Sequence, residues 1–382
     1  MLPSGEREII EVDCDLTVKG LATLLAIAET QHIALPLPQE LPYSEREHMR
    51  SVATDTPLYR QLDGSGLILF SSGTSGKPKG MLHNLNSLLN RYQSCKSRQD
   101  RSLLLLLIDH IGGIDAAFRS LLSGSTLIIP AARTPDAAAA AIEQHKVNVL
   151  PASPTFLNLM LLSRVHETYE LSSLQIIAYG AEAMPQTLLR KLGTVFPNAQ
   201  LQQKFGTSET GAIRIKSVEC NSLFFRITDS DTKWKVIEDE LWLKTPSQII
   251  GYINSDDSSL ESEGWYRTGD LVESDDSGNL RITGRVNEII NVGGQKVYPR
   301  EVACVIESLP NIHAVHVFGE NDPITGSRVC AKLFTASKDT PLDWKRRIRI
   351  HCRAKLAPWK IPSRIVLCHK LDVTDRLKQS VE

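Results

Sequence analysis

The stretch Phe70-Ser-Ser-Gly-Thr-Ser-Gly-Lys-Pro-Lys-Gly80 follows an apolar run, Leu67-Ile-Leu-Phe70, that is typical of a short buried strand. Its glycines allow the backbone to turn tightly and approach a ligand, while its hydroxyls and two lysines suit a polyphosphate. A flexible surface loop is the alternative interpretation. A common P-loop is disfavoured, because Gly73 and Gly76 are only three apart and Pro78 would interrupt a helix that begins at Lys77.

Around this stretch, segments with helical periodicity alternate with short apolar segments. We expect a helix over 20–30 followed by a strand over 33–38, and later a buried strand over 102–108 followed by a helix over 116–122. Such alternation predicts a doubly wound α/β fold with parallel strands. Ligands then gather at the carboxyl ends of the strands, where Asp109-His110-Ile-Gly-Gly113 is placed.

The length and charge exclude several classes of protein. A chain of 382 residues predicts two or three domains, and 43 basic against 44 acidic residues do not favour nucleic acid or an anionic membrane as partner. The seven cysteines lack CxxC spacing, which disfavours a zinc site and a disulfide framework. The first residues do not resemble a secretory leader, and the apolar run at 103–108 is too short to span a bilayer. We expect a soluble, cytoplasmic protein without a membrane span.

Four further motifs follow the first stretch in the chain. They are Tyr179-Gly-Ala-Glu182, Lys204-Phe-Gly-Thr-Ser-Glu209, Trp265-Tyr-Arg-Thr-Gly-Asp270 and Thr283-Gly-Arg285. Together and in this order they resemble the signatures of the acyl-adenylate-forming superfamily, which includes acyl- and aryl-CoA synthetases, adenylation domains of nonribosomal peptide synthetases, and luciferases. The resemblance covers most of residues 20–380.

The resemblance implies two domains. Residues 1–285 would form a large N-terminal domain of doubly wound sheets with a small β subdomain, and residues 286–382 a small α+β C-terminal lid domain. The phosphate loop stands well before its usual position in the superfamily, so the N-terminal domain looks shortened at its start. A homodimer contact or another protein would then cover apolar surface.

The resemblance also implies a binding site for ATP and Mg²⁺. Phe205 would stack on adenine, Asp270 would accept both ribose hydroxyls, and Ser208 would contact the α-phosphate. Glu209 would be the metal ligand. The full set expected to bind ATP or AMP is Ser71, Ser72, Gly73, Thr74, Ser75, Gly76, Lys79, Gly180, Ala181, Glu182, Phe205, Gly206, Thr207, Ser208, Asp270, Ile282 and Arg285.

Two residues resemble the superfamily's catalytic groups. Lys378, in Leu371-Asp-Val-Thr-Asp-Arg-Leu-Lys378, matches the lysine that neutralises the carboxylate and the α-phosphate. The usual glycine before that lysine is replaced by Leu377, and a solvated tail lysine is the alternative interpretation. His110 matches the histidine beside the carboxylate pocket. Ile111 falls where amino-acid-activating relatives place an aspartate, so an α-amino acid is disfavoured.

The implied activity is activation of an aryl or aliphatic carboxylic acid through an acyl-AMP intermediate, with release of pyrophosphate. Transfer to the thiol of CoA or of a carrier-protein phosphopantetheine would follow, after rotation about a hinge at Asn287, with Gly293 and Gly294 near the thiol channel. An amide-forming ligase and a nucleotide-binding subunit without turnover remain open as alternatives. A conventional P-loop ATPase is disfavoured by the glycine spacing.

Overall fold

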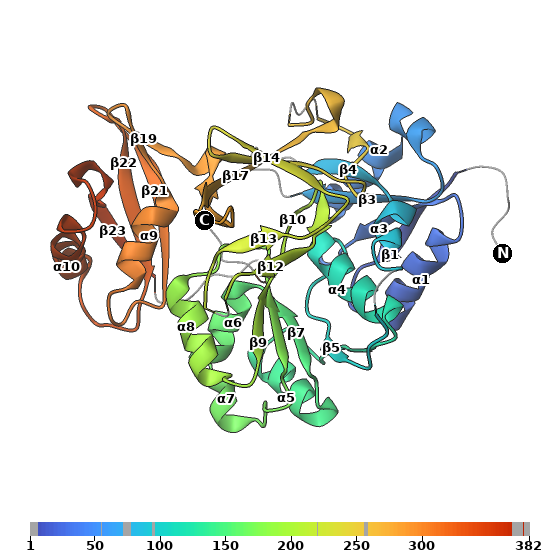
Figure 1. Ribbon diagram of the computed structural model, residues 1–382, viewed down its shortest axis with the longest axis horizontal. Helices are drawn as coiled ribbons and strands as arrows, with labels where there is room; N and C mark the ends of the chain where they lie inside the picture. Colours follow the sequence, from blue (N-terminus) through green and yellow to red (C-terminus); the bar gives the residue numbers. More distant parts are fainter. Residues whose placement is uncertain are drawn as a thin grey trace.

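The computed structural model describes residues 7–54, 56–71, 78–93, 96–219, 221–255, 259–368 and 377, with the backbone alone at 262. Two α/β sheets, one antiparallel sheet and a C-terminal α+β part follow one another along the chain (Figure 1). Within the described ranges, no helix combines the length and the apolar character needed to cross a bilayer.

The first sheet has the strand order β1-β2-β3-β4-β16. Its strands are β1 (Ile9–Asp13), β2 (Ile33–Leu37), β3 (Gly66–Ser71), β4 (Lys79–Asn84) and β16 (Gly251–Tyr252). The first three are parallel, whereas β4 pairs antiparallel with β3 and with β16. The accompanying helices are α1 (Val18–Ala28), α2 (Tyr43–Thr54), α3 (Leu85–Asn90) and the 3-10 helix η1 (Pro57–Gln61). Strand β2 is buried along its whole length, as a central strand between two layers of helices requires.

The second sheet is entirely parallel and has the order β6-β5-β7-β8-β9. Its strands are β5 (Arg101–Leu103), β6 (Thr126–Ile128), β7 (Val149–Ala152), β8 (Ile176–Tyr179) and β9 (Gln200–Gln203). Its helices are α4 (Ile111–Leu122), α5 (Pro135–His145), α6 (Pro154–Leu162), α7 (Val165–Thr168) and α8 (Gln186–Val195). Prolines at the first turns of α5 and α6 follow side-chain caps from Thr134 and Ser153, which explains where these helices begin.

Helix α4 lies between the two sheets. Its residues Ile114, Ala117 and Phe118 share a core with α1, α3 and the inner face of the first sheet. The opposite face of the second sheet is covered by α5, α6 and α8 around a separate core. The doubly wound α/β prediction is therefore confirmed for this part of the chain.

The predicted strand over 102–108 is wrong in its extent. Strand β5 ends at Leu103, and the buried residues that follow continue as an irregular segment. Leu105 packs into the core under α5, whereas Leu104 and Ile108 pack into the core around α4. The run contributes to both cores, and Leu104 still donates its N–H to the carbonyl oxygen of Ile128 in β6 at 2.8 Å although the strand has ended.

An antiparallel sheet stands over the carboxyl ends of the second sheet. Its order is β12-β13-β18-β17-β15-β14, and a short hairpin, β10 with β11, precedes it. The hairpin strands are β10 (Phe205–Thr207) and β11 (Gly211–Ile213), and those of the sheet are β12 (Ile215–Ser217), β13 (Phe225–Ile227), β14 (Lys233–Ile237), β15 (Glu240–Lys244), β17 (Tyr266–Ser274) and β18 (Leu280–Arg285). The 3-10 helix η2 (Ser262–Gly264) precedes β17. This sheet corresponds to the expected β subdomain.

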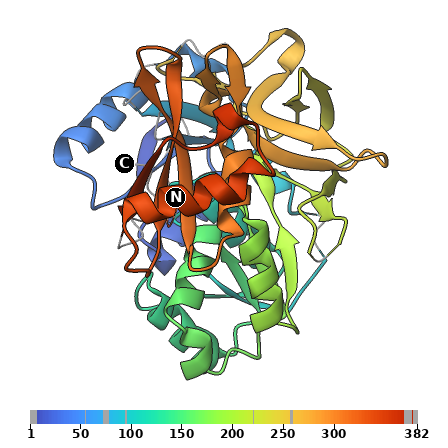
Figure 2. The same cartoon turned by 90° about the vertical axis from the view of Figure 1, so that its left-hand side faces the viewer.

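The C-terminal part is a sheet with two helices packed around its own core. The sheet comprises β19 (Ile290–Val292), β20 (Gln295–Val297), β21 (Ala314–Asp322), β22 (Gly326–Phe334) and β23 (Arg364–Cys368), and the helices are α9 (Pro299–Glu307) and α10 (Pro341–Arg353). The 3-10 helices η3 (Val286–Glu288) and η4 (Pro358–Lys360) lie at its entry and before β23. Figure 2 views the molecule from this side, with the orange and red C-terminal elements in front.

Candidate active site

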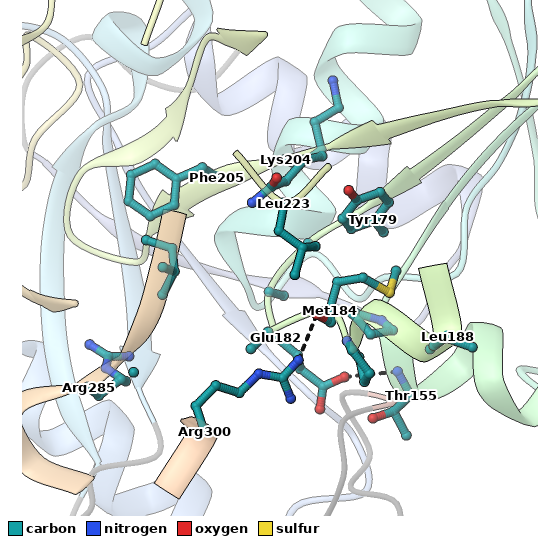
Figure 3. Close-up of a pocket in the computed structure, with 18 of the residues that line it drawn as sticks. Thr155, Tyr179, Glu182, Met184, Leu188, Lys204, Phe205, Leu223, Arg285 and Arg300 are labelled. Carbon is teal, nitrogen blue, oxygen red and sulfur yellow. Dashed lines mark hydrogen bonds between the residues drawn. The ribbon is translucent and has the colours of Figure 1, made fainter. Parts of the chain in front are cut away.

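A cavity of about 600 Å³ opens where the carboxyl ends of the second sheet meet the antiparallel sheet and the C-terminal part (Figure 3). Many residues predicted from separate motifs line it: Ser71, His110, Gly180, Ala181, Glu182, Phe205, Gly206, Thr207, Ser208, Glu209, Asp270, Ile282 and Arg285. They come from β3, the start of α4, the turn after β8, the β10–β11 hairpin, β17 and β18. The fold thus brings residues from distant motifs to one place.

Phe205 presents an aromatic surface to this cavity. Its ring stacks on the fully buried Phe225, with ring centroids 5.4 Å apart and planes inclined by 30°. The next residue must be glycine, since a Cβ at Gly206 would lie 2.2 Å from the carbonyl oxygen of Gly211. The aromatic ring therefore packs on a core residue and also lines the cavity.

The turn between β10 and β11 is held by the hydroxyl of Thr207. Its Oγ1 accepts the N–H groups of Glu209 at 3.2 Å and Thr210 at 3.1 Å. This local network presents Ser208 and Glu209 toward the cavity. Thr207 belongs to the set expected to bind ATP or AMP, and its side chain also shapes the turn.

The backbone after β8 makes a close and strained turn. A Cβ at Gly180 would lie 2.9 Å from the Cβ and the carbonyl oxygen of Lys204, so a flat ligand or neighbour can approach only glycine here. Ala181 adopts φ +67°, a left-handed conformation unfavourable for a residue other than glycine. Glu182 accepts the N–H of Thr155 at 3.1 Å, which fixes the turn against α6. Strain of this kind is concentrated at functional sites.

Asp270 and Arg285 face each other on β17 and β18, where they form one register pair. The guanidinium Nε lies 3.4 Å from Asp270 Oδ1, and Nη2 donates to the carbonyl oxygen of Thr268 at 2.8 Å. Burial raises the pKa of Asp270 to about 6, while the positive charge of Arg285 opposes that rise. A buried carboxylate with a raised pKa gains from hydroxyl donors that reach it.

Glu209 is oriented by Tyr252, whose hydroxyl donates to Glu209 Oε1 at 3.0 Å. The ammonium group of Lys79 lies 5.8 Å from the centroid of the Tyr252 ring. Among the described residues, no group of three or more His, Cys, Asp or Glu side chains could hold a metal by itself. One carboxylate oxygen beside a phosphate site nevertheless suits Mg²⁺, which takes one or two protein carboxylates and completes its shell with phosphate oxygens and water.

His110 stands where this cavity meets a second one of about 320 Å³. It caps α4, because its Nδ1 accepts the N–H of Gly112 at 3.1 Å. Ile111, the first residue of the helix, lines both cavities as well. The predicted place of His110 beside a carboxylate pocket stays a prediction; the structure shows that His110 lines both cavities.

Some predicted residues lie outside the described residues. They are Ser72, Gly73, Thr74, Ser75 and Gly76 of the phosphate loop, and Lys378. The residues that flank the loop, Ser71 and Lys79, form the last pair of the β3–β4 ladder.

Leu377, directly before Lys378, is described. It is 8% exposed and packs into the core around β7 and α6, and its carbonyl oxygen accepts a hydrogen bond from Ser153 Oγ. Its φ of +55° is the conformation for which the superfamily's glycine is suited. The residue before the predicted catalytic lysine is thus docked on the second sheet.

Four predicted residues do not line the cavity. Lys79 is set back in β4, and Asn287 lies in η3, in the connection to the C-terminal part. Gly293 and Gly294 form the turn between β19 and β20, with φ values of +57° and +82°. Their roles as hinge and thiol channel refer to a rotated arrangement and stay predictions.

The sequence reasoning missed the contacts that the C-terminal part makes at the cavity. Arg300, on α9, donates from Nη2 to the carbonyl oxygen of Met184 at 2.7 Å and lies 3.4 Å from Glu307 (Figure 3). Asn158, on α6, donates to the carbonyl oxygen of His313 at 3.0 Å. Nothing local in the sequence signals the contacts of Arg300 with Met184 and of Asn158 with His313, because each joins two distant segments.

Comparison with known families gives two matches along the chain. The AMP-binding enzyme family matches residues 22–233, which is more than half of the chain, and the family of AMP-binding enzyme C-terminal domains matches residues 301–378. The two matches leave the predicted boundary at residue 285 untested.

Two curated relatives and one solved structure illustrate the similarity. The medium-chain fatty-acid–CoA ligase of Escherichia coli is 25% identical over 98% of this chain and 74% of its own length. The 2-succinylbenzoate–CoA ligase of Bacillus velezensis is 28% identical over 80% of this chain and 65% of its own length. The structure of the anthranilate CoA ligase AuaEII in complex with anthranoyl-AMP matches with a TM-score of 0.82 at 19% identity. The match covers 98% of this chain and 86% of the AuaEII chain. The chain thus spans about two thirds to three quarters of the two curated relatives, and the structural likeness supports the fold alone.

Proposed function

Because the chain belongs to the AMP-binding enzyme family, we propose that it activates a carboxylic acid with ATP and transfers the acyl group to a thiol. The observation that carries this proposal is the convergence of residues from five motifs on one cavity, beside which a second cavity leads away from His110. The similarity to ligases of fatty and aryl acids supports an aryl or aliphatic acid as substrate and CoA as acceptor.

The nucleotide would bind in the 600 Å³ cavity. Phe205 offers its ring to adenine opposite the turn at Gly180, where the backbone comes close. Asp270 would accept hydrogen bonds from the ribose hydroxyls. Burial disfavours its ionised form, which raises its pKa, and such hydrogen bonds would stabilise that form. Ser208 and Arg285, which also line the cavity, would contact the phosphate oxygens.

In the first step an oxygen of the substrate carboxylate attacks the α-phosphorus of ATP. The bond from that phosphorus to the bridging oxygen breaks, so acyl-AMP forms and pyrophosphate leaves with the electron pair. His110 borders the carboxylate, and Lys378 neutralises charge on the carboxylate and the α-phosphate. The docking of Leu377 beside Ser153 supports this assignment of Lys378, although Lys378 itself lies outside the described residues.

Magnesium, held through Glu209, would neutralise phosphate charge when bound. The contribution of the chain is to aim the Glu209 carboxylate, which Tyr252 orients through its hydroxyl. Arg300 and Met184, joined by a hydrogen bond, form part of the wall of this cavity.

The second step would need the lid, residues 286–382, to rotate relative to residues 1–285 about Asn287. Gly293 and Gly294 would then border the channel for the thiol of CoA or of a carrier-protein phosphopantetheine. A cytoplasmic location is supported by four of the described cysteines, Cys14, Cys304, Cys330 and Cys352, which are reduced thiols. A homodimer stays part of the proposal, as a cover for exposed apolar surface.

The test measures pyrophosphate release from MgATP with a panel of aryl and aliphatic acids. We expect release to require an acid and to fall about a hundredfold in Lys378→Ala, because that change removes a charge aimed at the transition state. Lys345→Ala, at an exposed position on α10, is the matched control. Steady release of phosphate instead of pyrophosphate, or ATP binding without release with any acid, would contradict the proposal.

Supplying CoA, a phosphopantetheinylated carrier protein or a primary amine to the preformed acyl-AMP identifies the acceptor. Thioester formation with CoA supports the main proposal. Product with the amine alone would instead favour an amide-forming ligase.

A further inference from the structure

The second cavity, of about 320 Å³, lies between helix α4 and one face of the second sheet. It shares His110, Gly180 and Lys204 with the nucleotide cavity, so the two are adjacent at the carboxyl ends of the strands. The inference that follows rests on the proposed function, which places the reacting carboxyl group at this junction.

The register of the sheet gives the cavity a near end and a far end. Gly180 follows β8 at the near end, and Ile176, four residues earlier, lies at the far end about 13 Å away. Ser102 of β5 is in register with Val149 of β7, and Val149 is in register with Ile176 of β8. These three residues therefore lie side by side across the sheet and form a row at the far end of the cavity, the far row. Helix α4 runs the opposite way, and Arg119 lies nine residues beyond His110, also about 13 Å.

The middle of the cavity is apolar. Its walls there are Ala116 of α4 and Pro151 and Ala178 of the sheet. A hydrocarbon chain or a ring fits against these apolar walls, beside Asp115, whose carboxylate is already paired with Arg119.

The far end is polar, which a pocket for a plain hydrocarbon tail does not need. Four hydroxyl side chains line the cavity toward this end: Ser102, Ser120, Ser123 and Ser125. The charged residues that line it are Lys96, Arg98, Asp100, Asp115 and Arg119. Arg119 lies 3.0 Å from Asp115 and Arg98 lies 3.6 Å from Asp100, so the carboxylates are matched by guanidinium groups. Lys96 adds a further positive charge.

Ser102 is the most informative of these residues. It is 2% exposed, and its Oγ is buried without a hydrogen-bond partner within the described part of the chain. A buried hydroxyl without a partner is unfavourable, since its hydrogen bonds to water are lost on folding. A ligand atom that reaches the far row would supply the missing partner.

We propose that the substrate acid carries an oxygen group, a hydroxyl or a second carboxylate, at the end remote from the reacting carboxyl. The apolar middle holds its hydrocarbon body, and the hydroxyl of Ser102 hydrogen-bonds the remote oxygen. The excess of positive charge around the far end suits a remote carboxylate as well as a hydroxyl. Allowing one hydrogen bond of about 3 Å at the far end, the acid spans roughly 10 Å.

Acid-dependent pyrophosphate release tests this proposal in two matched series. The aliphatic series is octanoate, 8-hydroxyoctanoate and octanedioate, and the aryl series is 4-phenylbutanoate, its para-hydroxy derivative and its para-carboxy derivative. We expect the hydroxy acid to exceed the plain acid in kcat/KM by about three- to tenfold, as one neutral hydrogen bond would give. A larger advantage for the second carboxylate would identify the remote group as anionic.

The variant Ser102→Ala separates this contact from the rest of the site. It should lose the advantage of the hydroxy acid while its kcat/KM for the plain acid is kept, and its melting temperature shows whether it folds. Ser51→Ala, at an exposed hydroxyl on α2, is the matched control and should change neither value.

Three results would overturn the proposal. A preference for plain acids in both series, or an equal advantage in wild type and Ser102→Ala, refutes the remote contact while adenylation stands. Absence of pyrophosphate release with every acid refutes the proposed function and this inference with it.

Discussion

The protonation of Asp270 should control nucleoside binding. Its carboxylate is expected to accept the two ribose hydroxyls, and burial raises its pKa from the ordinary 3.8 to about 6 against the opposing charge of Arg285. Lowering the pH through 6 therefore removes the acceptor. If only the ionised form binds, affinity at pH 5 should be about one tenth of that at pH 8, since about a tenth of the groups remain ionised.

The assay is equilibrium dialysis of adenosine between pH 5 and pH 8. Adenosine is chosen because it has the ribose hydroxyls and no phosphate that titrates in this range. Asp270→Asn should bind weakly and without this pH dependence, and circular dichroism shows whether each sample remains folded. Equal wild-type affinity at pH 5 and pH 8, or the same slope in Asp270→Asn, would refute the reasoning.

The raised pKa of Asp270 has the corresponding effect on stability. In the range between its unfolded and folded pKa values, the folded protein binds more protons than the unfolded chain. The contribution of Asp270 to folding is therefore full below about pH 4 and is lost as the pH rises through about 6. Bound adenosine should offset part of that loss at neutral pH.

Three further changes test separate contacts of the site. Tyr252→Phe should raise the Mg²⁺ concentration for half-maximal activity by about three- to tenfold, because Glu209 loses its orienting hydroxyl; an unchanged Mg²⁺ titration would contradict this. Leu377→Gly removes about 2 kcal/mol of hydrophobic stabilisation of the docked segment and relieves about 1 kcal/mol of backbone strain. Pyrophosphate release should therefore slow about fivefold. An equal or faster rate would show that the docked side chain is dispensable. Arg300→Ala leaves the buried Glu307 carboxylate without the guanidinium group that faces it, so the free energy of unfolding in urea should fall by about 2 kcal/mol. Adding Glu307→Gln should restore part of that free energy. An unchanged free energy of unfolding would mean that this pair is not coupled to folding.

Sequence pattern identifies a motif most readily where the motif has a local backbone requirement. Gly206 and Gly180 are such cases, because each permits a contact that a Cβ would block. The apolar run at 102–108 is the opposite case. Hydrophobicity predicted its burial correctly, but only hydrogen-bonding partners decide where a strand ends, and those partners belong to β6 and β7.

The sequence by itself determined the family, the α/β fold and the residues expected to bind ATP, because each motif places specific chemistry on a short piece of backbone. The tertiary structure decided what lies between those motifs. The contact of Arg300 with Met184, the docking of Leu377 and the polar far end around Ser102 all depend on long-range packing and strand register. No local pattern encodes such contacts, since the partners are separated by many residues and meet only when the sheets and helices have packed.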